Sequence, residues 1–203
     1  MPRVIAGALG GRRFAAPSGE ATRPTAERVR EALFSALAAD LPDAVVLDLF
    51  AGSGALAIEA LSRGASRAVL VESGRRAVAV IRRNLGDLGL DEPAGRALVR
   101  GVAARAFCAA PEGGPFDVVL ADPPYDLPAE ALAACVGDLA AAGALRPGAR
   151  VVLERDRRGV EALEAARPPA VAPERVRAYG DTVLVWWRAS DEVPGEARGD
   201  PPT

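Results

Sequence analysis

The residues best suited to chemistry lie in ADPPYD, from Ala121 to Asp126. They follow FDVVL, a short apolar run that predicts a buried strand. Two consecutive prolines fix two φ angles, remove two N–H donors and favour extended geometry in the residue before them. The strand therefore ends in a stiff, acceptor-rich corner that carries the Asp122 carboxylate and the ring of Tyr125. This corner suits a flat ligand that donates hydrogen bonds.

Methyl transfer from a sulfonium to the exocyclic amino group of a base would use such a corner. That amine is a poor nucleophile, because its lone pair is delocalised into the ring. Acceptors on its N–H groups hold it toward tetrahedral geometry and stabilise the positive charge of the transition state. Asp122 and the Pro123 carbonyl can accept these bonds, and Tyr125 can stack on the base. The candidate catalytic residues are Asp122, Pro123, Pro124 and Tyr125.

A second stretch, DLFAGSGALAIEAL (residues 48–61), ends a strand, makes a Gly-x-Gly turn and begins a helix. Glycines let a ligand approach the backbone, and a helix N-terminus offers unpaired N–H groups. Gly52, Gly54 and Ala57 satisfy the loose form of the dinucleotide-binding fingerprint. Alone, the turn is equally compatible with a nucleotide cofactor, another ligand or a plain tight turn.

Glu72 ends the next strand, in AVLVES, 18 residues after Gly54. An acid there can hold two ribose hydroxyls, although a solvated strand-end carboxylate explains Glu72 alone equally well. The turn and the acid together favour an adenosine-containing cofactor, without choosing among NAD, FAD and S-adenosylmethionine. The corner at Asp122 favours S-adenosylmethionine, because hydride transfer has no use for it.

Composition excludes several classes of enzyme. The 203-residue chain has no histidine, which rules out Ser-His-Asp and Cys-His catalysis and removes the commonest zinc ligand. Cys108 and Cys135 lack metal-type spacing, so we interpret them as small buried hydrophobes in a reducing compartment and expect no metal. No signal peptide and no run long enough to span a membrane are visible, and we expect a cytoplasmic location.

The motifs are positioned by alternating strands and helices. This alternation predicts a parallel, doubly wound sheet, and two final strands joined at Gly180-Asp181 predict a hairpin with one strand antiparallel at or near an edge. The strand-like runs are 45–50, 68–72, 97–101, 116–122 and 149–154, and the helical stretches fall near 54–63, 74–86, 103–110, 128–141 and 158–166.

The two ends of the chain differ from this pattern. Residues 3–14 predict a small hairpin with glycines at its turn. Residues 22–41 predict a helix with Thr25 as its N-cap and an amphipathic pattern from Arg28 to Leu41. We therefore expect an N-terminal extension over 1–41, a catalytic domain over 42–188 and a disordered tail over 189–203.

The stretches DLFAGSGALAIEALSRGA, VES and ADPPY, in this order, resemble the amino-methylating class I S-adenosylmethionine-dependent methyltransferases. RVIAGALGGRRF, TRPTAERVREALF and YGDTVL more narrowly resemble the RsmD family, bacterial enzymes that modify the N2 amino group of guanine 966 in 16S ribosomal RNA. The resemblance covers roughly residues 2–188. It implies a Rossmann-like fold whose mostly parallel seven-stranded sheet ends in an antiparallel hairpin, with an N-terminal hairpin and helix added.

The resemblance also implies the cofactor and its site. Asp48, Gly52 and Gly54 should line the methionine end of S-adenosylmethionine, and Glu72 should hold the ribose. Where the family often has an acid or amide near the adenine, this chain has Val102 and Ala103, which leaves a backbone or apolar contact. The full set of expected cofactor-binding residues is Asp48, Phe50, Ala51, Gly52, Gly54, Glu72, Ser73, Val102, Ala103, Thr22 and Arg28.

Arginines near the N-terminus are expected to face the substrate. Thr22, Arg23 and Arg28 should close the site, where a cation meets the cofactor carboxylate or a phosphate. The candidate RNA contacts are Arg3, Arg12 and Arg13 on the hairpin, together with Arg23, although small arginine clusters are often only solvated. We expect a monomer whose partner is 16S ribosomal RNA or the small ribosomal subunit, assembling or assembled, and we expect no membrane partner.

Three alternatives stay open. A DNA adenine-N6 or cytosine-N4 methyltransferase would use the same corner, but no separate sequence-reading domain is visible. A non-catalytic adenosine- or RNA-binding module would not need the intact Asp-Pro-Pro-Tyr. An NAD-dependent oxidoreductase would need a substrate domain and an acid–base group that the sequence does not offer.

Overall fold

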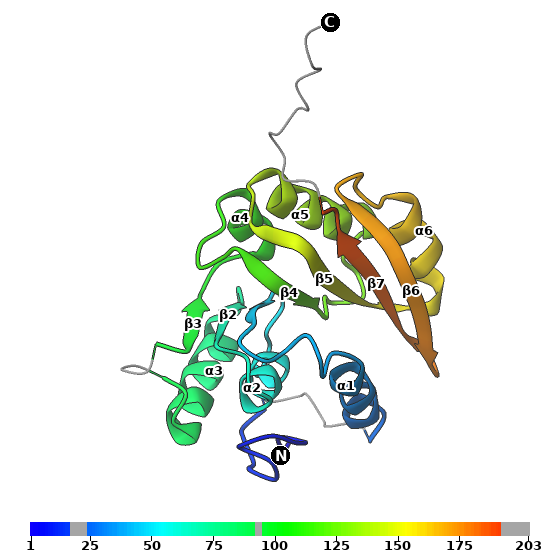
Figure 1. Ribbon diagram of the computed structural model, residues 1–203. Helices are drawn as coiled ribbons and strands as arrows, with labels where there is room; N and C mark the ends of the chain where they lie inside the picture. The colour runs from blue at the N-terminus through cyan, green and yellow to red at the C-terminus, as the bar shows by residue number, and fades with distance from the viewer. Residues whose placement is uncertain (17–23, 92–94, 192–203) are drawn as a thin grey trace, which may run out of the picture.

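A seven-stranded sheet forms the centre of the computed structural model, which describes residues 1–16, 24–91 and 95–191 (Figure 1). The strands lie in the order β3-β2-β1-β4-β5-β7-β6; those from β3 to β5 pair in parallel, whereas β7 is antiparallel to both β5 and β6. They are β1 (Val45–Asp48), β2 (Arg67–Val71), β3 (Ala97–Arg100), β4 (Phe116–Ala121), β5 (Leu145–Asp156), β6 (Val171–Tyr179) and β7 (Thr182–Ala189). The predicted α/β fold with its C-terminal antiparallel hairpin is confirmed.

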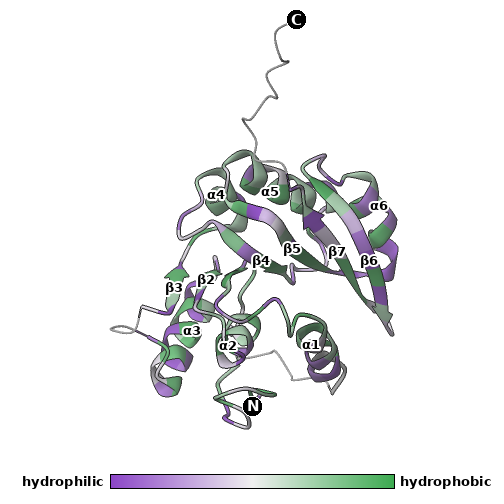
Figure 2. Ribbon diagram, viewed as in Figure 1, coloured by the Kyte–Doolittle hydropathy of each residue, from purple (hydrophilic) through white to green (hydrophobic). Residues whose placement is uncertain are grey.

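Helices cover both faces of the sheet. On one face, α1 (Pro24–Ala36), α2 (Ala55–Ser62) and α3 (Arg75–Leu88) pack against one row of strand side chains. On the other, α4 (Ala104–Ala109), α5 (Ala129–Ala141) and α6 (Val160–Ala165) pack against the alternate row. The central strands are accordingly hydrophobic along their length, and hydrophilic residues gather on β6 and on the outer side of α3 (Figure 2).

The N-terminal residues are fastened to α2. Arg3 and Arg13 form a single antiparallel bridge across the predicted hairpin. The carboxylate of Glu59, 1% exposed, accepts the backbone N–H groups of Ile5 and Ala6 at 2.7 and 3.0 Å. A Cβ on Gly7, which has φ +84°, would lie 2.0 Å from the Ser62 carbonyl oxygen. This approach requires glycine and fixes the N-terminal segment against the helix.

Helix α1 differs from the prediction at both ends. It begins at Pro24, so the expectation that Thr25 caps it is wrong: Thr25 lies inside the first turn. The physical reason is that proline suits the first helical position, where its missing N–H is not needed. The helix ends at Ala36, although Leu37 and Leu41 beyond it remain buried in the same core as the sheet.

The order of the strands determines where a ligand can bind. After β3 the chain returns to the other side of β1 and forms β4, so the direction of winding reverses between β1 and β4. In such sheets, ligands bind beyond the carboxyl ends of the strands at this reversal. Within the described residues, no helix has the length and apolar content needed to cross a membrane.

Candidate active site

The turn after β1 exposes its backbone at Gly52. Gly52 and Gly54 have φ values of +53° and +82°, which favour glycine. A Cβ added to Gly52 would meet nothing within 4 Å, whereas one on Gly54 would lie 3.2 Å from Leu70 Cδ2. Gly54 is therefore needed for packing at the start of α2, and Gly52 leaves open space for a ligand to approach the main chain.

Glu72 is held beside this turn by both of its carboxylate oxygens. Oε2 accepts the N–H of Gly52 at 2.9 Å, and Oε1 accepts the N–H of Gly74 at 2.7 Å. The first bond joins the end of β2 to the turn after β1. The predicted ribose-binding acid and the predicted glycine turn are thus parts of one structure.

Asp48 lies beneath the turn and is fully buried. Its Oδ2 accepts the N–H of Ala57 at 3.2 Å, which ties the end of β1 to α2. Burial, and then the charges of Asp122 and Glu72, raise the pKa of this carboxyl from 3.8 to about 7. Its Oδ1 has no hydrogen-bond partner among the described residues.

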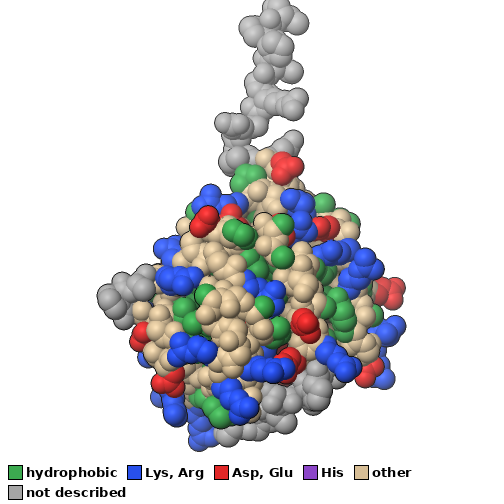
Figure 3. All heavy atoms as spheres, turned by 60° about the horizontal axis from the view of Figure 1, so that its bottom comes forward, with side chains coloured by type: hydrophobic (Ala, Val, Ile, Leu, Met, Phe, Trp, Pro, Cys, Tyr) green, Lys and Arg blue, Asp and Glu red, His purple; other side chains and the backbone are tan. Residues whose placement is uncertain are grey.

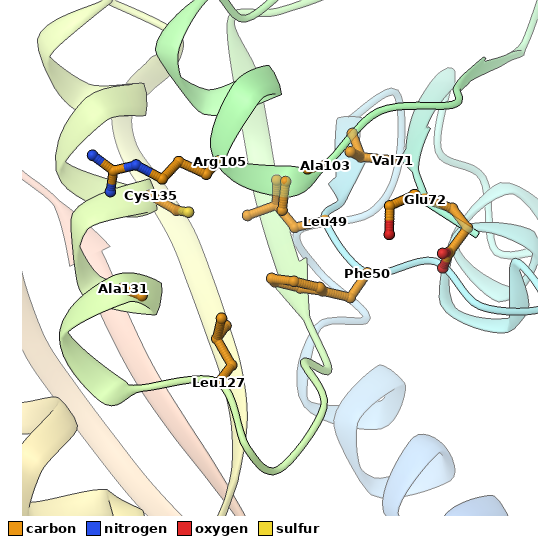
Figure 4. Close-up of a pocket in the computed structure, with 11 residues that line it drawn as sticks. Leu49, Phe50, Val71, Glu72, Ala103, Arg105, Leu127, Ala131 and Cys135 are labelled. Atoms are coloured by element: carbon orange, nitrogen blue, oxygen red, sulfur yellow. The ribbon is translucent and has the colours of Figure 1, made fainter. Parts of the chain in front are cut away.

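An apolar cavity of about 220 Å³ opens next to Glu72, on the face of the sheet covered by α4 and α5 (Figure 4). We call it the apolar cavity; its lining residues are Leu49, Phe50, Val71, Glu72, Ser73, Ala103, Ala104, Arg105, Leu127, Ala131 and Cys135. Glu72 stands on the side opposite Arg105 and Cys135 (Figure 4). The cavity brings together the predicted Phe50, Glu72, Ser73 and Ala103, whereas Val102 is 41% exposed and does not line it.

A second cavity, of about 270 Å³, lies at the same end of the sheet and contains two carboxylates. We call it the carboxylate cavity; its lining residues are Pro2, Ala16, Val29, Arg30, Leu33, Phe50, Ala51, Gly52, Ser53, Ala55, Leu56, Asp122 and Glu154. It holds the predicted Ala51, Gly52 and Asp122, and it shares Phe50 with the apolar cavity. The two cavities therefore meet at the turn after β1.

The Asp-Pro-Pro-Tyr corner leaves β4 as predicted. The strand ends at Ala121, Pro123 is buried, and the N–H of Leu127 donates to the Pro124 carbonyl at 3.0 Å to close the turn. Tyr125 is 65% exposed and lines neither cavity in the described part of the chain. An exposed ring in the turn between Asp122 and Leu127, each of which lines a cavity, is open to a base that arrives from solution.

Glu154 is a site residue that the sequence interpretation missed. It follows Leu153 on β5, which pairs with Ala121 at the end of β4, so Glu154, within β5, lies next to Asp122, the first residue after β4. Burial, and then the charge of Asp122, raise the pKa of Glu154 from 4.5 to about 8. An acid at the end of an apolar strand was the signal that identified Glu72, and the same signal was present in ARVVLE.

Arg30 is the second missed residue. It lines the carboxylate cavity and donates to the Arg3 carbonyl at 2.7 Å, and burial lowers the pKa of its guanidinium. The predicted Arg28 is exposed and lines neither cavity. Residues that are two positions apart on a helix lie on different faces, so only one of Arg28 and Arg30 can point toward the cavity. Thr22 and Arg23 lie outside the described residues.

The hairpin arginines have unequal surroundings. Arg3 pairs with Glu27 at 2.7 Å, and Arg12 donates to the Asp87 and Leu88 carbonyls at the end of α3, at 2.6 and 3.4 Å. Arg13 is exposed and makes no hydrogen bond or ion pair through its side chain to the described residues. Figure 3 shows a face of the molecule on which arginines are spread among acidic residues.

Comparison with known proteins defines the class first. An RNA methyltransferase from Salinibacter ruber, solved with S-adenosyl-L-homocysteine, has the same fold: its TM-score is 0.60 at 22% identity, over 86% of this chain and 98% of that one. The solved structure of yhhF from Escherichia coli matches with a TM-score of 0.77 at 32% identity, over 94% of this chain and 98% of that one. The fold is that of the class I methyltransferases, as predicted.

The family follows from the sequence. The family described as "Conserved hypothetical protein 95" matches residues 2–188, and this chain belongs to it. "Ribosomal RNA small subunit methyltransferase D" of Escherichia coli is 44% identical over 123 residues, which are 61% of this chain and 60% of that protein. The chain thus spans about three fifths of this relative's length in the matched region. The resemblance to the RsmD family is confirmed.

Proposed function

We propose that this chain methylates the N2 amino group of a guanine in 16S ribosomal RNA, with S-adenosylmethionine as the methyl donor. The observation that carries the proposal is the joining of two predicted motifs in one cavity: Gly52 of the glycine turn and Asp122 of the Asp-Pro-Pro-Tyr corner both line the carboxylate cavity. The relative named for methylation of small-subunit ribosomal RNA supports the choice of substrate, and guanine 966 is the nucleotide we propose.

The site fits an adenosine-containing cofactor. The apolar cavity offers a slot for a flat ring, with Glu72 at its side for hydroxyl groups and Ser73 next to it. Beyond Phe50, the open space at Gly52 can receive the polar end of the same molecule. When bound there, S-adenosylmethionine would supply a sulfonium-bound methyl group, and its sulfur would keep the bonding electron pair on transfer to nitrogen.

The protein's own part in the reaction is to hold the amine. Asp122 accepts one N–H and the Pro123 carbonyl accepts the other, which directs the nitrogen lone pair out of the ring plane. Both acceptors stabilise the positive charge that nitrogen gains, and Asp122 can take the released proton. Pro123 and Pro124 keep the acceptors in place, and Tyr125 stacks on the base at the cavity mouth.

The test is tritium transfer from labelled S-adenosylmethionine to ribosomal RNA and small subunits from cells that lack this gene. Labelled N2-methylguanosine, mapped to one nucleotide, is the expected product. Subunits from cells that keep the gene are the matched control, because their target is already modified and should take up no label. Label in N6-methyladenosine or N4-methylcytosine, or in DNA alone, would favour the rival methyltransferases. No label in any nucleic acid, with intact cofactor binding, would favour a binding module.

A further inference from the structure

Glu154 stands beside the corner that holds the amine. In the parallel pair of β4 and β5, Ala121 lies opposite Leu153, and both belong to the core covered by α4 to α6. Side chains alternate along a strand, so the next residues, Asp122 and Glu154, turn to the opposite face. There both line the carboxylate cavity together with residues of α1. The cavity therefore presents two neighbouring carboxylates to whatever enters it.

The Glu154 carboxylate calls for a ligand that brings a hydrogen-bond donor. Among the described residues, no arginine is ion-paired with Glu154, and the charge that acts on it is that of Asp122. Ionised Glu154 only accepts hydrogen bonds, and burial beside the charge of Asp122 disfavours this ionised form unless a donor binds it. The described residues also contain no group of three or more acids, cysteines or histidines that could hold a metal ion. A ligand edge that donates a hydrogen bond is therefore the partner that fits Glu154.

We propose that Glu154 accepts the ring N1–H of the target guanine while Asp122 and the Pro123 carbonyl hold its N2 amino group. Guanine is the base in which a ring N–H adjoins the exocyclic amine, so that both donate on one edge. In adenine and cytosine the ring nitrogen next to the amine carries a lone pair, which would face the lone pairs of Glu154. Glu154 thus makes the corner, which alone suits any exocyclic amine, selective for guanine. The inference rests on the proposed function.

The size of the effect follows from unpaired polar groups. A site built to hydrogen-bond a substrate N–H rejects an analogue that lacks it by about 10⁴–10⁵-fold when the site is fully buried. Glu154 is only partly buried, so we expect discrimination on the order of 10²-fold, by the same reasoning about unpaired groups. The charge on Glu154 is needed for this discrimination, because a protonated carboxyl could donate to a ring nitrogen.

The experiment compares two substrates that both carry the N2 amine. One is small-subunit RNA with the target guanine; the other, made by ligation, has 2-aminopurine there, which has the amine but a lone pair at N1. Reactions run at pH 8.5, above the pKa of about 8 of the free Glu154 carboxyl. The wild-type protein should prefer guanine by about 10²-fold in kcat/KM. In Glu154→Gln the preference should fall to within about tenfold, because the amide can present either an acceptor or a donor to N1.

The exposed Glu161→Gln on α6 is the matched control and should keep the wild-type preference. A merely structural role of Glu154 would lower both rates together and leave their ratio unchanged, and that result would overturn the inference alone. Absence of methyl transfer to guanine by the wild-type protein would overturn the proposed function and this inference with it. The two failures are therefore distinguishable in one series of reactions.

Discussion

The two cavities at the end of the sheet are built by different means. The apolar cavity lies on the face of α4 and α5, and Glu72 is the acid among side chains from β2, α4, α5 and the adjoining loops. The carboxylate cavity lies on the face of α1 and α2 and includes Asp122, Glu154 and Arg30. The first can select a ligand by its flat shape, and the second by its donors and charge. This difference fits the proposed function, in which the adenosine part of the cofactor and the target base are recognised by separate physical criteria on either side of Phe50.

If this division is correct, the largest effect should come from the carboxylate cavity. Asp122→Ala removes one acceptor from the amine, and turnover should fall about 10²–10³-fold, as when one donor is removed from an oxyanion hole. Cofactor affinity should change much less than turnover, because Asp122 does not line the apolar cavity that takes the adenosine part. Single-turnover methylation at saturating cofactor measures the effect.

The exposed neighbour Asp126 provides the control for this variant. Asp126→Ala removes a carboxylate from the same turn without touching either cavity and should react at the parent rate. A folded Asp122→Ala protein that methylates as fast as Asp126→Ala would contradict the proposal that Asp122 holds the target amine.

The opposite pattern is expected at the apolar cavity. Glu72→Ala removes charge-assisted hydrogen bonds to the cofactor and should weaken its binding by about 1.5–3 kcal/mol. Substrate RNA affinity should stay the same. Calorimetry with S-adenosylmethionine makes the measurement, and Glu72→Gln, which keeps one acceptor for the Gly52 N–H, separates loss of charge from disturbance of the turn.

Equal cofactor affinity in wild-type and Glu72→Ala proteins would remove Glu72 from the cofactor site. A parallel loss of stability, followed by urea unfolding, would show that the bonds to Gly52 and Gly74 serve the fold instead.

The sequence predicted the acidic residues of the site better than the apolar residues that line it. Glu72 and Asp122 end apolar strands, and parallel strands bring their carboxyl ends together, so both were predictable. Glu154 gave the same signal but no motif surrounds it. Leu127, in the loop before α5, and Cys135, on α5, line the apolar cavity. Nothing in their residue types distinguishes them from other core residues. Packing decides which face of α1 turns inward, and the local sequence pattern does not specify it. The sequence therefore could not show that Arg30, rather than Arg28, lines the cavity.

The raised pKa values of Asp48 and Glu154 should make the free energy of unfolding depend on pH. Asp48 and Glu154 have pKa values of about 7 and 8 in the folded protein, above their ordinary values of 3.8 and 4.5. Between about pH 4 and pH 8 the folded state therefore binds more protons than the unfolded state, and the free energy of unfolding should fall as pH rises. Glu154→Gln removes one of these groups and should reduce that fall by roughly 1–3 kcal/mol, since one unit of pKa is worth about 1.4 kcal/mol.

Urea unfolding at several pH values makes this measurement, with Glu161→Gln as the control on the exposed surface. An unchanged pH dependence in Glu154→Gln would mean that the carboxyl is not held in the protonated form by its surroundings.

The smallest effect is expected outside both cavities, at the hairpin arginines. Arg12 donates to two carbonyls at the end of α3, so Arg12→Ala should lower the free energy of unfolding by about 0.3–1 kcal/mol, as for other cations at a helix C-terminus.

Arg13 has no such contact among the described residues, so Arg13→Ala should act on RNA instead. If Arg13 contacts one phosphate, the slope of log affinity against log salt should become shallower by about 0.7–0.9. Filter binding of small-subunit RNA over a range of salt measures the slope for both variants. A slope that is unchanged in Arg13→Ala would assign this arginine to the solvated surface, and the hairpin would then contribute to the fold through Glu59 rather than to recognition.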